Sequence, residues 1–227
     1  MTTNIFKNSD LINSLVLGLI IGLFLLFVMT NLKGEIPMPG FLSASMWLML
    51  IITPTLVTLW IYLAFNLGTR WPVFFQFGKF VTIGLSNTAI DFGLLNLFMY
   101  ISHVERGLFF SLFKGFSFLV AVSNSFIWNK FWTFNNNYRE QLGRQFIKFL
   151  VISGVAFIIN VGVASLIVNV IGPIGKFSPT LWANIGALAS LGITLHGPSL
   201  VTNLSCLHKV GMHKTGRKVD LMVSEDL

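Results

Sequence analysis

Two segments of this chain, residues 76–101 and 145–170, repeat one pattern. Each opens with glutamine, phenylalanine and lysine and continues as an apolar run that holds one polar side chain, Asp91 in the first copy and Asn160 in the second. Asn160 follows Asp91 by 69 residues (160 − 91 = 69), and the two opening lysines are the same distance apart. A unit of this length is therefore duplicated. It crosses a membrane an even number of times if both copies begin with basic residues on one side, and two crossings fit the hydropathy.

The composition requires a membrane environment. Of the 227 residues, 54% are hydrophobic and 10% are charged, and the mean hydropathy is +0.78. So little polar surface cannot keep a globule in solution. A hydrocarbon core about 30 Å thick needs about 20 apolar residues per helix, and the sequence offers six such stretches, at about residues 11–31, 42–67, 79–101, 108–129, 149–171 and 179–195. We therefore predict an all-α fold, an integral membrane bundle of six transmembrane helices with a duplicated two-helix unit.

The first stretch and the single cysteine narrow the possibilities further. The apolar run from Leu15 to Val28 is long, and no small-residue cleavage site follows it before Lys33, so we expect a retained helix and not a signal peptide. Cys206 is the only cysteine, which excludes an internal disulfide and a thiolate metal cluster.

The repeat divides the chain into three parts. Residues 1–72 lie outside it and form an N-terminal extension with two helices, the second of which should be kinked by Pro54. Residues 73–200 form a four-helix domain, and residues 201–227 form a basic tail that we expect to be cytoplasmic and disordered. The extension is either an added anchor, which we favour, or a direct participant in substrate handling.

Basic residues gather in alternate loops, and this orients the helices. The loop after residue 129 and the C-terminal tail are the most basic, while Arg70 and Lys79 flank another loop on the same side. By the positive-inside rule, these segments and both termini lie in the cytoplasm. The formal net charge of +7 is spread over membrane loops. It forms no stripe that could follow a phosphate backbone, so we expect no nucleic-acid partner.

Two motifs resemble one protein family. The first opens a membrane helix with Phe77-Gly78-Lys79-Phe80 and continues with Gly84, Asn87 and Asp91-Phe92. The second is an aromatic segment where a helix leaves the membrane, Ser125-Phe126 followed by Asn129-Lys130-Phe131-Trp132-Thr133-Phe134. This pattern resembles the GtrA-like family of small four-helix bacterial membrane proteins, over about residues 73–195. The resemblance implies a protein of the bacterial cytoplasmic (inner) membrane that works with polyprenyl-phosphate-linked sugars. Members either move these lipids or support the glycosyltransferases that use them. The N-terminal helix pair departs from the family's four-helix plan.

Asp91 is the sharpest candidate for a functional residue. A carboxylate this far inside a membrane helix costs about 2.5 to 3.5 kcal/mol on insertion scales, so it should face the bundle or a water-filled cavity and have a partner. It either handles substrate or joins helices as a structural hydrogen-bonding residue, and the sequence favours neither interpretation. Asn160 makes the matching position of the second unit polar but neutral.

Other polar and small residues lie in the same helices. Lys114 could pair with Asp91 or bind a lipid phosphate, but we expect it to snorkel to the outer headgroups. Asn87, Asn96 and Asn124 should join helices through hydrogen bonds worth about 0.6 kcal/mol each. Glycines should allow close helix packing at Gly84, Gly93, Gly154 and Gly162.

Four cations gather with Asn129 at the predicted cytoplasmic ends of both units, namely Lys79, Lys130, Arg144 and Lys148. A polyprenyl phosphate carries its anion at that depth, and these side chains could hold it. Topology and attraction to anionic lipid explain the same charges equally well. The four histidines lack metal-ligand spacing, and the sequence has no phosphate-cradling loop or nucleophile elbow. We therefore expect neither an enzyme nor a cofactor or metal site.

These features lead to one functional prediction with two alternatives. We predict that the chain binds a polyprenyl-phosphate-linked sugar and helps translocate it. The basic residues would capture the phosphate, and the sugar would pass a polar interior lined by Asp91, Asn87, Asn124 and Asn160. One alternative is a non-transporting anchor that recruits a membrane glycosyltransferase. The other is a small-solute or drug exporter, which the basic residues at the cytoplasmic ends of the helices disfavour. Membrane lipids and a second copy of the chain, in a homo-oligomer, are further partners compatible with this prediction.

The sequence after Leu195 has the marks of a reading-frame error. The family pattern leads us to expect an aromatic exit there, but His196-Gly197-Pro198 breaks the helix before a polar tail without periodicity. One back-translation of residues 196–206, read from its third base, gives WTFLGYKFVV, which resembles the exit at residues 128–134. If the reading frame is wrong, the basic tail is a product of the error and not a binding element. The second unit then lacks the aromatic segment with which its last helix would leave the membrane.

Reporter fusions test the predicted topology. Fusions after Leu227 and at Asn136 should both report a cytoplasmic location, because the tail and the most basic loop lie on the same side of the membrane. A periplasmic signal from the Asn136 fusion would overturn the topology.

Overall fold

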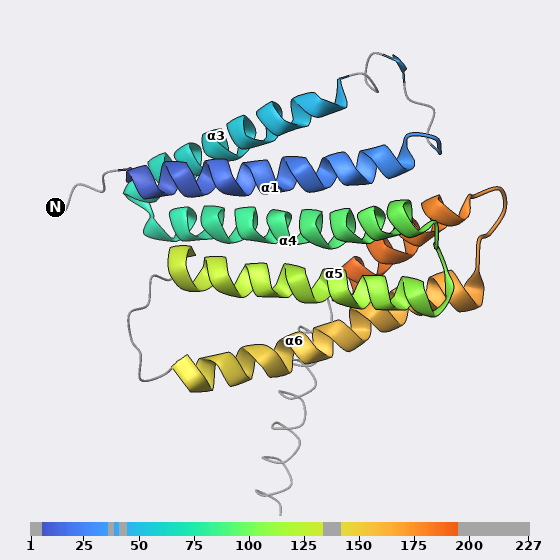
Figure 1. Ribbon diagram of the computed structural model, residues 1–227. Helices are drawn as coiled ribbons and strands as arrows, with labels where there is room; N and C mark the ends of the chain where they lie inside the picture. Colours follow the sequence, from blue (N-terminus) through green and yellow to red (C-terminus); the bar gives the residue numbers. More distant parts are fainter. Residues whose placement is uncertain (1–5, 36–38, 41–44, 134–141, 195–227) are drawn as a thin grey trace, which may run out of the picture.

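The structure is a computed structural model that describes residues 6–35, 39–40, 45–133 and 142–194, with the backbone alone for residues 142–150. Within these residues the regular elements are all helical (Figure 1). They are α1 (Asn8–Leu32), the 3-10 turn η1 (Met46–Leu48), α3 (Met49–Arg70), α4 (Pro72–Ser102), α5 (Gly107–Trp128), the π-helical η2 (Asn129–Thr133), α6 (Leu142–Ser165), the π-helical η4 (Leu166–Ile171) and a last helix over residues 179–194.

Five helices in the described part of the chain are long and apolar enough to cross a membrane. They span Asn8–Leu32, Met46–Arg70, Pro72–Ser102, Gly107–Thr133 and Val151–Ile171. These correspond to the first five predicted stretches, and the last helix corresponds to the sixth. The prediction of an all-α, multi-pass membrane bundle is therefore confirmed. The tail and the suspected reading-frame error after Leu195 lie outside the described residues.

Several helices extend beyond the predicted apolar stretches. α4 begins at Pro72 and not near residue 79, because Trp71 before it is extended (φ −134°, ψ 97°) and a proline in the first helical turn needs no hydrogen-bond acceptor for a missing N–H. Likewise α5 continues through η2 to Thr133. A helix in lipid satisfies its own backbone groups, so it continues across polar residues that lower the hydropathy of a sequence window.

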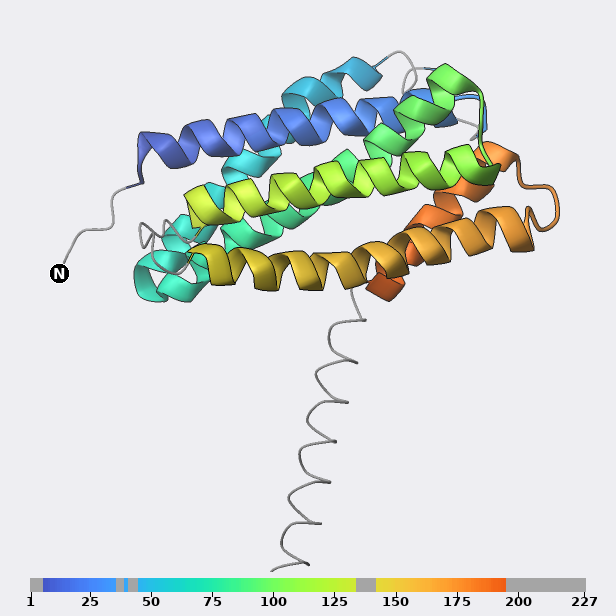
Figure 2. The ribbon, with the colours of Figure 1, turned by 60° about the horizontal axis from the view of Figure 1, so that its bottom comes forward.

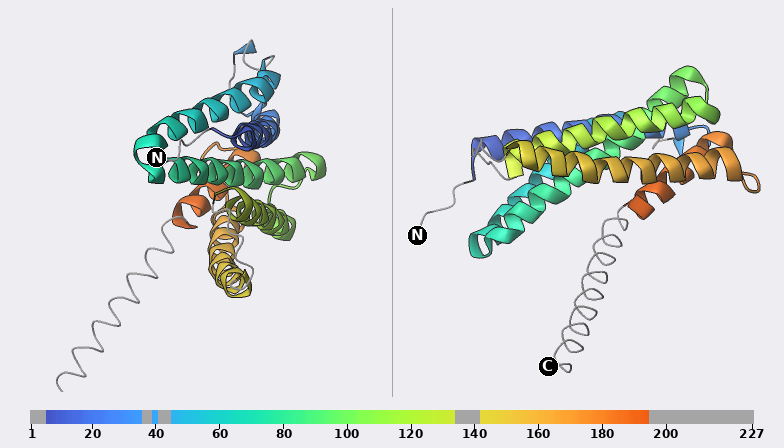
Figure 3. Two further views of the ribbon diagram at one scale, coloured as in Figure 1. Left: turned by 90° about the vertical axis from the view of Figure 1, so that its left-hand side faces the viewer. Right: turned by 90° about the horizontal axis from the view of Figure 1, so that it is seen from below.

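α4 lies at the centre of the bundle (Figures 1 and 3). α1 and α3 pack on each other and on α4, while α5 packs against the opposite side of α4 and α6 packs against α5. The last helix, coloured orange to red in Figure 2, lies beside α6 and η4, where Trp182 and Ala187 pack against Ala164 and Val168. The N-terminal extension is thus packed directly onto the repeat region.

One end of the bundle collects the start of α1, the end of α3, the start of α4 and the junction of α5 with α6, at the left of Figure 1. This end carries Lys79 and Lys130, and we call it the basic end. A buried cluster holds it together, with Leu17 from α1, Ile61 from α3, Ile83 from α4 and Trp132 from η2. A separate buried cluster around Leu95, Met99 and Phe110 joins α4 and α5 to the last helix.

α1 and α3 approach each other closely at Pro54. A Cβ added at Gly18 would lie 2.3 Å from the Cα of Pro54, so only glycine fits against this part of α3. Beside it, the Thr53 hydroxyl donates to the carbonyl oxygens of Gly18 at 2.8 Å and of Met49 at 2.6 Å. A polar bridge between helices therefore accompanies the proline inside α3, as membrane helices require.

The glycines predicted to allow close packing do so in one case. At Gly93 an added Cβ would lie 2.5 Å from the Cβ of Phe24, so this glycine lets α1 approach α4. The expectation is wrong for three others, which have no described atom within 4 Å of an added Cβ: Gly84, Gly154 and Gly162. A spacing of small residues identifies a smooth helix face but does not identify the helix that covers it.

Candidate functional site

The centre of the candidate site is an ion pair buried between α4 and α5. Lys114 Nζ donates to Asp91 Oδ2 at 2.5 Å, and the Ser117 hydroxyl donates to Asp91 Oδ1 at 2.7 Å. Lys114 is fully buried, and Asp91 is 4% exposed. Each carboxylate oxygen therefore has a donor, and neither charge is left in contact with lipid tails.

The expectation that Lys114 snorkels to the headgroups is wrong. α5 presents Lys114 to α4, where the Asp91 carboxylate lies within hydrogen-bond distance of the ammonium, at 2.5 Å. Burial of both charges costs desolvation energy, and the attraction within the dry interior, together with the hydrogen bond from Ser117, offsets that cost. Ser117 was not predicted, although it follows Lys114 by about one helical turn and so shares its face.

Further polar contacts continue from the ion pair toward the basic end. Asn124 Nδ2 donates to Asn87 Oδ1 at 2.8 Å and to the Ser86 hydroxyl at 3.3 Å, again between α5 and α4. Lys114 and Asn124 are about 15 Å apart along α5 at the usual rise per residue. We call this line the polar seam; it consists of Ser86, Asn87, Asp91, Lys114, Ser117 and Asn124.

The structure does not bring Asn160 to the polar seam. Asn160 lies in α6, is 1% exposed and donates to the Thr194 hydroxyl of the last helix at 3.4 Å. Its Oδ1 atom has no hydrogen-bond partner among the described residues. Asn160 and Thr194 are both neutral, and the described helices of the second unit, residues 151–171 and 179–194, hold no charged residue. The second unit therefore lacks both charges of the pair, and a lone buried charge is avoided.

At the basic end Lys79 is already paired. Its Nζ atom lies 2.6 Å from Asp10 Oδ1, and the same oxygen accepts a hydrogen bond from Trp132 Nε1 at 2.9 Å. Aromatic rings flank the ammonium, with the Phe75 centroid at 4.3 Å and the Trp132 centroid at 5.2 Å. Asp10 belongs to α1 and was not predicted as a site residue. The only advance signal was an acidic residue in the first turn of a helix.

The remaining predicted cations are not brought to Lys79 by any described contact. Lys130 Nζ lies over the rings of Phe131 and Phe126, at 4.9 Å and 5.7 Å from their centroids. Asn129 Nδ2 donates to the Ser125 hydroxyl at 3.2 Å, and its buried Oδ1 has no described partner. The side chains of Arg144 and Lys148 lie outside the described residues.

The π-helical turn η2 aims Trp132 at Asp10. Trp132 and Thr133 are both buried, at 6% and 8% exposure, while Phe131 is 66% exposed. A π-turn holds an additional residue compared with an α-turn, so it changes which side chains face inward at the end of a helix. No sequence period predicts such a turn.

Three asparagines join α1, α4 and the last helix. Asn96 and Asn184 exchange side-chain hydrogen bonds at 2.7 Å and 3.0 Å, and Asn31 donates to Asn96 Oδ1 at 2.8 Å. The prediction that Asn87, Asn96 and Asn124 join helices is confirmed. Asn31 and Asn184 were missed, because each lies near the end of an apolar stretch, where an asparagine is common.

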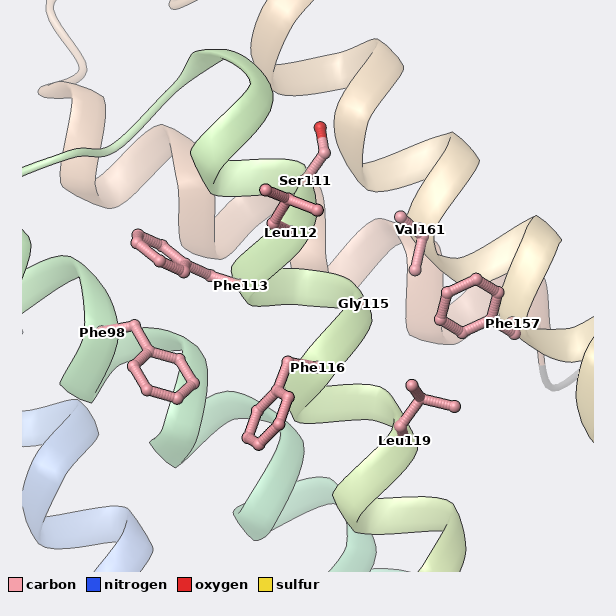
Figure 4. Close-up of a pocket in the computed structure, with 9 residues that line it drawn as sticks. All are labelled: Phe98, Ser111, Leu112, Phe113, Gly115, Phe116, Leu119, Phe157 and Val161. Atoms are coloured by element: carbon pink, nitrogen blue, oxygen red, sulfur yellow. The ribbon is translucent and has the colours of Figure 1, made fainter.

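Two apolar hollows open on the lipid-facing surface. The larger, about 750 Å³, lies between α5 and its neighbours α4 and α6, with Phe98, Phe116 and Phe157 on its walls and Ser111 as its only polar lining residue (Figure 4). The other, about 400 Å³, is lined by α1, α3 and α4 together with Leu188. Asp91 and Lys114 line neither hollow. Among the described residues, no three His, Cys, Asp or Glu side chains gather as a metal site would require.

Comparisons with known proteins agree with this arrangement. The family model described as "GtrA/DPMS, transmembrane domain" matches residues 79–196, which begin at Lys79 and leave out α1 and α3. An uncharacterized membrane protein, YngA of Bacillus subtilis (strain 168), is 30% identical over 109 residues, which cover 43% of this chain and 68% of that protein. No solved structure matches.

A double-mutant cycle tests whether Asp91 and Lys114 are one unit. Lys114→Ala alone leaves a buried carboxylate unpaired and should lower the free energy of unfolding by about 3 to 5 kcal/mol. The double variant Asp91→Asn, Lys114→Ala leaves no unpaired charge in the interior and should recover more than half of that loss. The measurement is unfolding of the purified protein in mixed micelles. A double variant as unstable as the sum of the two single variants would contradict the coupling.

Proposed function

Because the chain belongs to the GtrA/DPMS transmembrane-domain family, we propose that it binds polyprenyl-phosphate-linked sugars and helps to translocate them across the bacterial cytoplasmic membrane for cell-surface polysaccharide synthesis. Family membership supports a multi-pass membrane protein that takes part in processes using glycosyl carrier lipids, in a family of generally non-catalytic proteins. The translocation step and the orientation, with both termini in the cytoplasm, are the proposal's own.

The polar seam is the observation that carries this proposal. A buried ion pair adds little stability, because desolvation offsets most of the attraction, and apolar residues of the same size pack at least as well. In the second unit Asn160 takes the place of Asp91, and its described partner is the neutral side chain of Thr194. Since one unit folds without the charges, the pair in the other unit supports a role beyond holding α4 against α5.

The seam offers hydrogen-bonding partners of the kind that a sugar needs. Sugar hydroxyls both donate and accept, as the amides of Asn87 and Asn124 do, and the Asp91 carboxylate accepts. In the structure these groups satisfy one another. A sugar would replace their mutual bonds as α4 and α5 part, while the phosphate is held by cations at the basic end and the polyprenyl tail stays in lipid. The sequence has no motif for ATP hydrolysis, so movement is downhill or coupled to consumption of the sugar lipid.

One observation favours the anchor as a second candidate. Asp91 and Lys114 are closed off from solvent, and neither described hollow reaches them. An anchor that recruits a membrane glycosyltransferase needs no such opening. The exporter is disfavoured, because the position that a cationic solute would take beside Asp91 is filled by the Lys114 ammonium.

Flipping of a lipid-linked sugar in reconstituted vesicles tests the proposal. Asp91→Asn removes the intramembrane carboxylate with little change in volume and should slow flipping at least about tenfold while leaving membrane insertion intact. The double variant Asp91→Asn, Lys114→Ala, which leaves no unpaired charge, should be equally slow. Ser123→Ala is the control, because Ser123 is exposed on α5 and bonds only within its own helix, to the carbonyl of Leu119 at 2.8 Å.

The outcomes separate the candidates. Unchanged flipping by both Asp91 variants would reduce the ion pair to a packing role. Absence of flipping by the native protein, together with retained binding to a glycosyltransferase, would favour the anchor.

A further inference from the structure

We propose that Lys79 and Trp132 form an anion-binding site that Asp10 fills in the closed protein, and that the phosphate of the lipid-linked sugar occupies this site when Asp10 withdraws. This inference rests on the proposed function, which it deepens by assigning the phosphate a place and a built-in competitor. It also gives the N-terminal helix pair a role in substrate handling.

The contacts of Asp10 describe what the site selects. A single carboxylate oxygen meets both the Lys79 ammonium, at 2.6 Å, and the Trp132 indole N–H, at 2.9 Å. A cation and an N–H that converge on one point bind an oxygen that carries negative charge. A phosphate oxygen has the same charge and the same hydrogen-bonding capacity, so it meets the same two donors without any change in Lys79 or Trp132.

The surroundings of Lys79 make this cation effective. Its side chain is 11% exposed and that of Asp10 is 7% exposed, so the pair is shielded yet touches the surface. Phe75 and Trp132 line the ammonium with ring faces and not with other anions. Attraction between a cation and an anion is stronger in such a place than in open water. Once Asp10 has left, the ammonium therefore needs another anion.

Asp10 is placed so that it can leave. It lies in the first turn of α1, where the backbone N–H of Asp10 bonds to the carbonyl of Lys7 at 2.9 Å. The ends of helices open more readily than their middles. Release of the carboxylate needs this turn to open and Phe6, just before it, to shift against Tyr62 and Phe65. Ser14, one turn further, keeps its own contact with α3 through Thr58 at 3.1 Å.

The position of the site favours an anion attached to a lipid. Lys79 lies about two turns from the start of α4 at Pro72, beside the Trp132 ring. The ring centroids of Trp132 and Trp128 are 6.0 Å apart. Tryptophans gather at the headgroup level of membranes. An anion that reaches this depth with an apolar tail in the neighbouring lipid has a local concentration that a free anion lacks.

Binding of farnesyl phosphate to the full chain in nanodiscs tests the inference, with farnesol and inorganic phosphate as the other probes. Asp10→Asn keeps the acceptor for Trp132 but removes the competing charge, so it should tighten farnesyl phosphate binding by roughly tenfold. Lys79→Gln should abolish this gain when the two changes are combined. Ser14→Ala, which disturbs α1 without touching Lys79, should bind as the native protein does. Farnesol should bind equally to all variants.

A second measurement uses the native protein and does not depend on the folding of any variant. Addition of farnesyl phosphate should speed hydrogen exchange of the amides in the first turn of α1, whereas a ligand that binds elsewhere leaves that exchange unchanged or slows it. This readout would not move if Asp10 only held α1 in place.

The outcomes distinguish failure of this inference from failure of the proposed function. Native protein that binds farnesyl phosphate, with no tightening in Asp10→Asn and no faster exchange in α1, would overturn the inference and leave the proposed function standing. Absence of farnesyl phosphate binding by the native protein and by Asp10→Asn would overturn both. Equal gains for farnesyl phosphate and inorganic phosphate would retain the anion site but remove its preference for a lipid.

Discussion

The absence of water inside a bilayer is the constraint on which the rest of this structure depends. Every polar group at that depth must find its partner within the chain. Asp91 and Lys114 meet this demand as an ion pair completed by Ser117. Two pairs of asparagines meet it by bonding across helices, Asn87 with Asn124 and Asn96 with Asn184. The polar contacts therefore decide which helix faces are buried, and apolar residues fill the remaining space without specifying partners as sharply.

How far the sequence predicted this arrangement follows from the same constraint. The six helices and a buried, partnered Asp91 were predictable, because hydropathy and an intramembrane carboxylate are properties of single segments. Partners were not, because they depend on how helices are rotated. Lys114 was expected at the headgroups yet faces Asp91. Asp10 meets Lys79 and Trp132 only because α1 packs on α4 and a π-turn redirects Trp132.

The two units differ in their buried polar residues. The first unit carries the charge pair and the polar seam, and the second carries Asn160 bonded to the neutral Thr194. α1, outside the family-matched region, adds the Asp10 carboxylate to the basic end of the first unit. All the ion pairs found among the described residues thus involve the first unit. This asymmetry supports placing the proposed sugar-binding step between α4 and α5. Opening the seam would expose groups for the sugar, and freeing Lys79 from Asp10 would expose a cation for its phosphate.

The central claim is that the polar seam opens when substrate is handled. Cysteine accessibility measures this directly, since Cys206 is the only native cysteine and Cys206→Ser removes it. In that background, Asn124→Cys should react with a membrane-impermeant thiol reagent, and faster when a lipid-linked sugar is present, whereas Ser123→Cys on the exposed face of α5 should not change its rate. A reaction rate of Asn124→Cys that the lipid-linked sugar leaves unchanged would contradict the account.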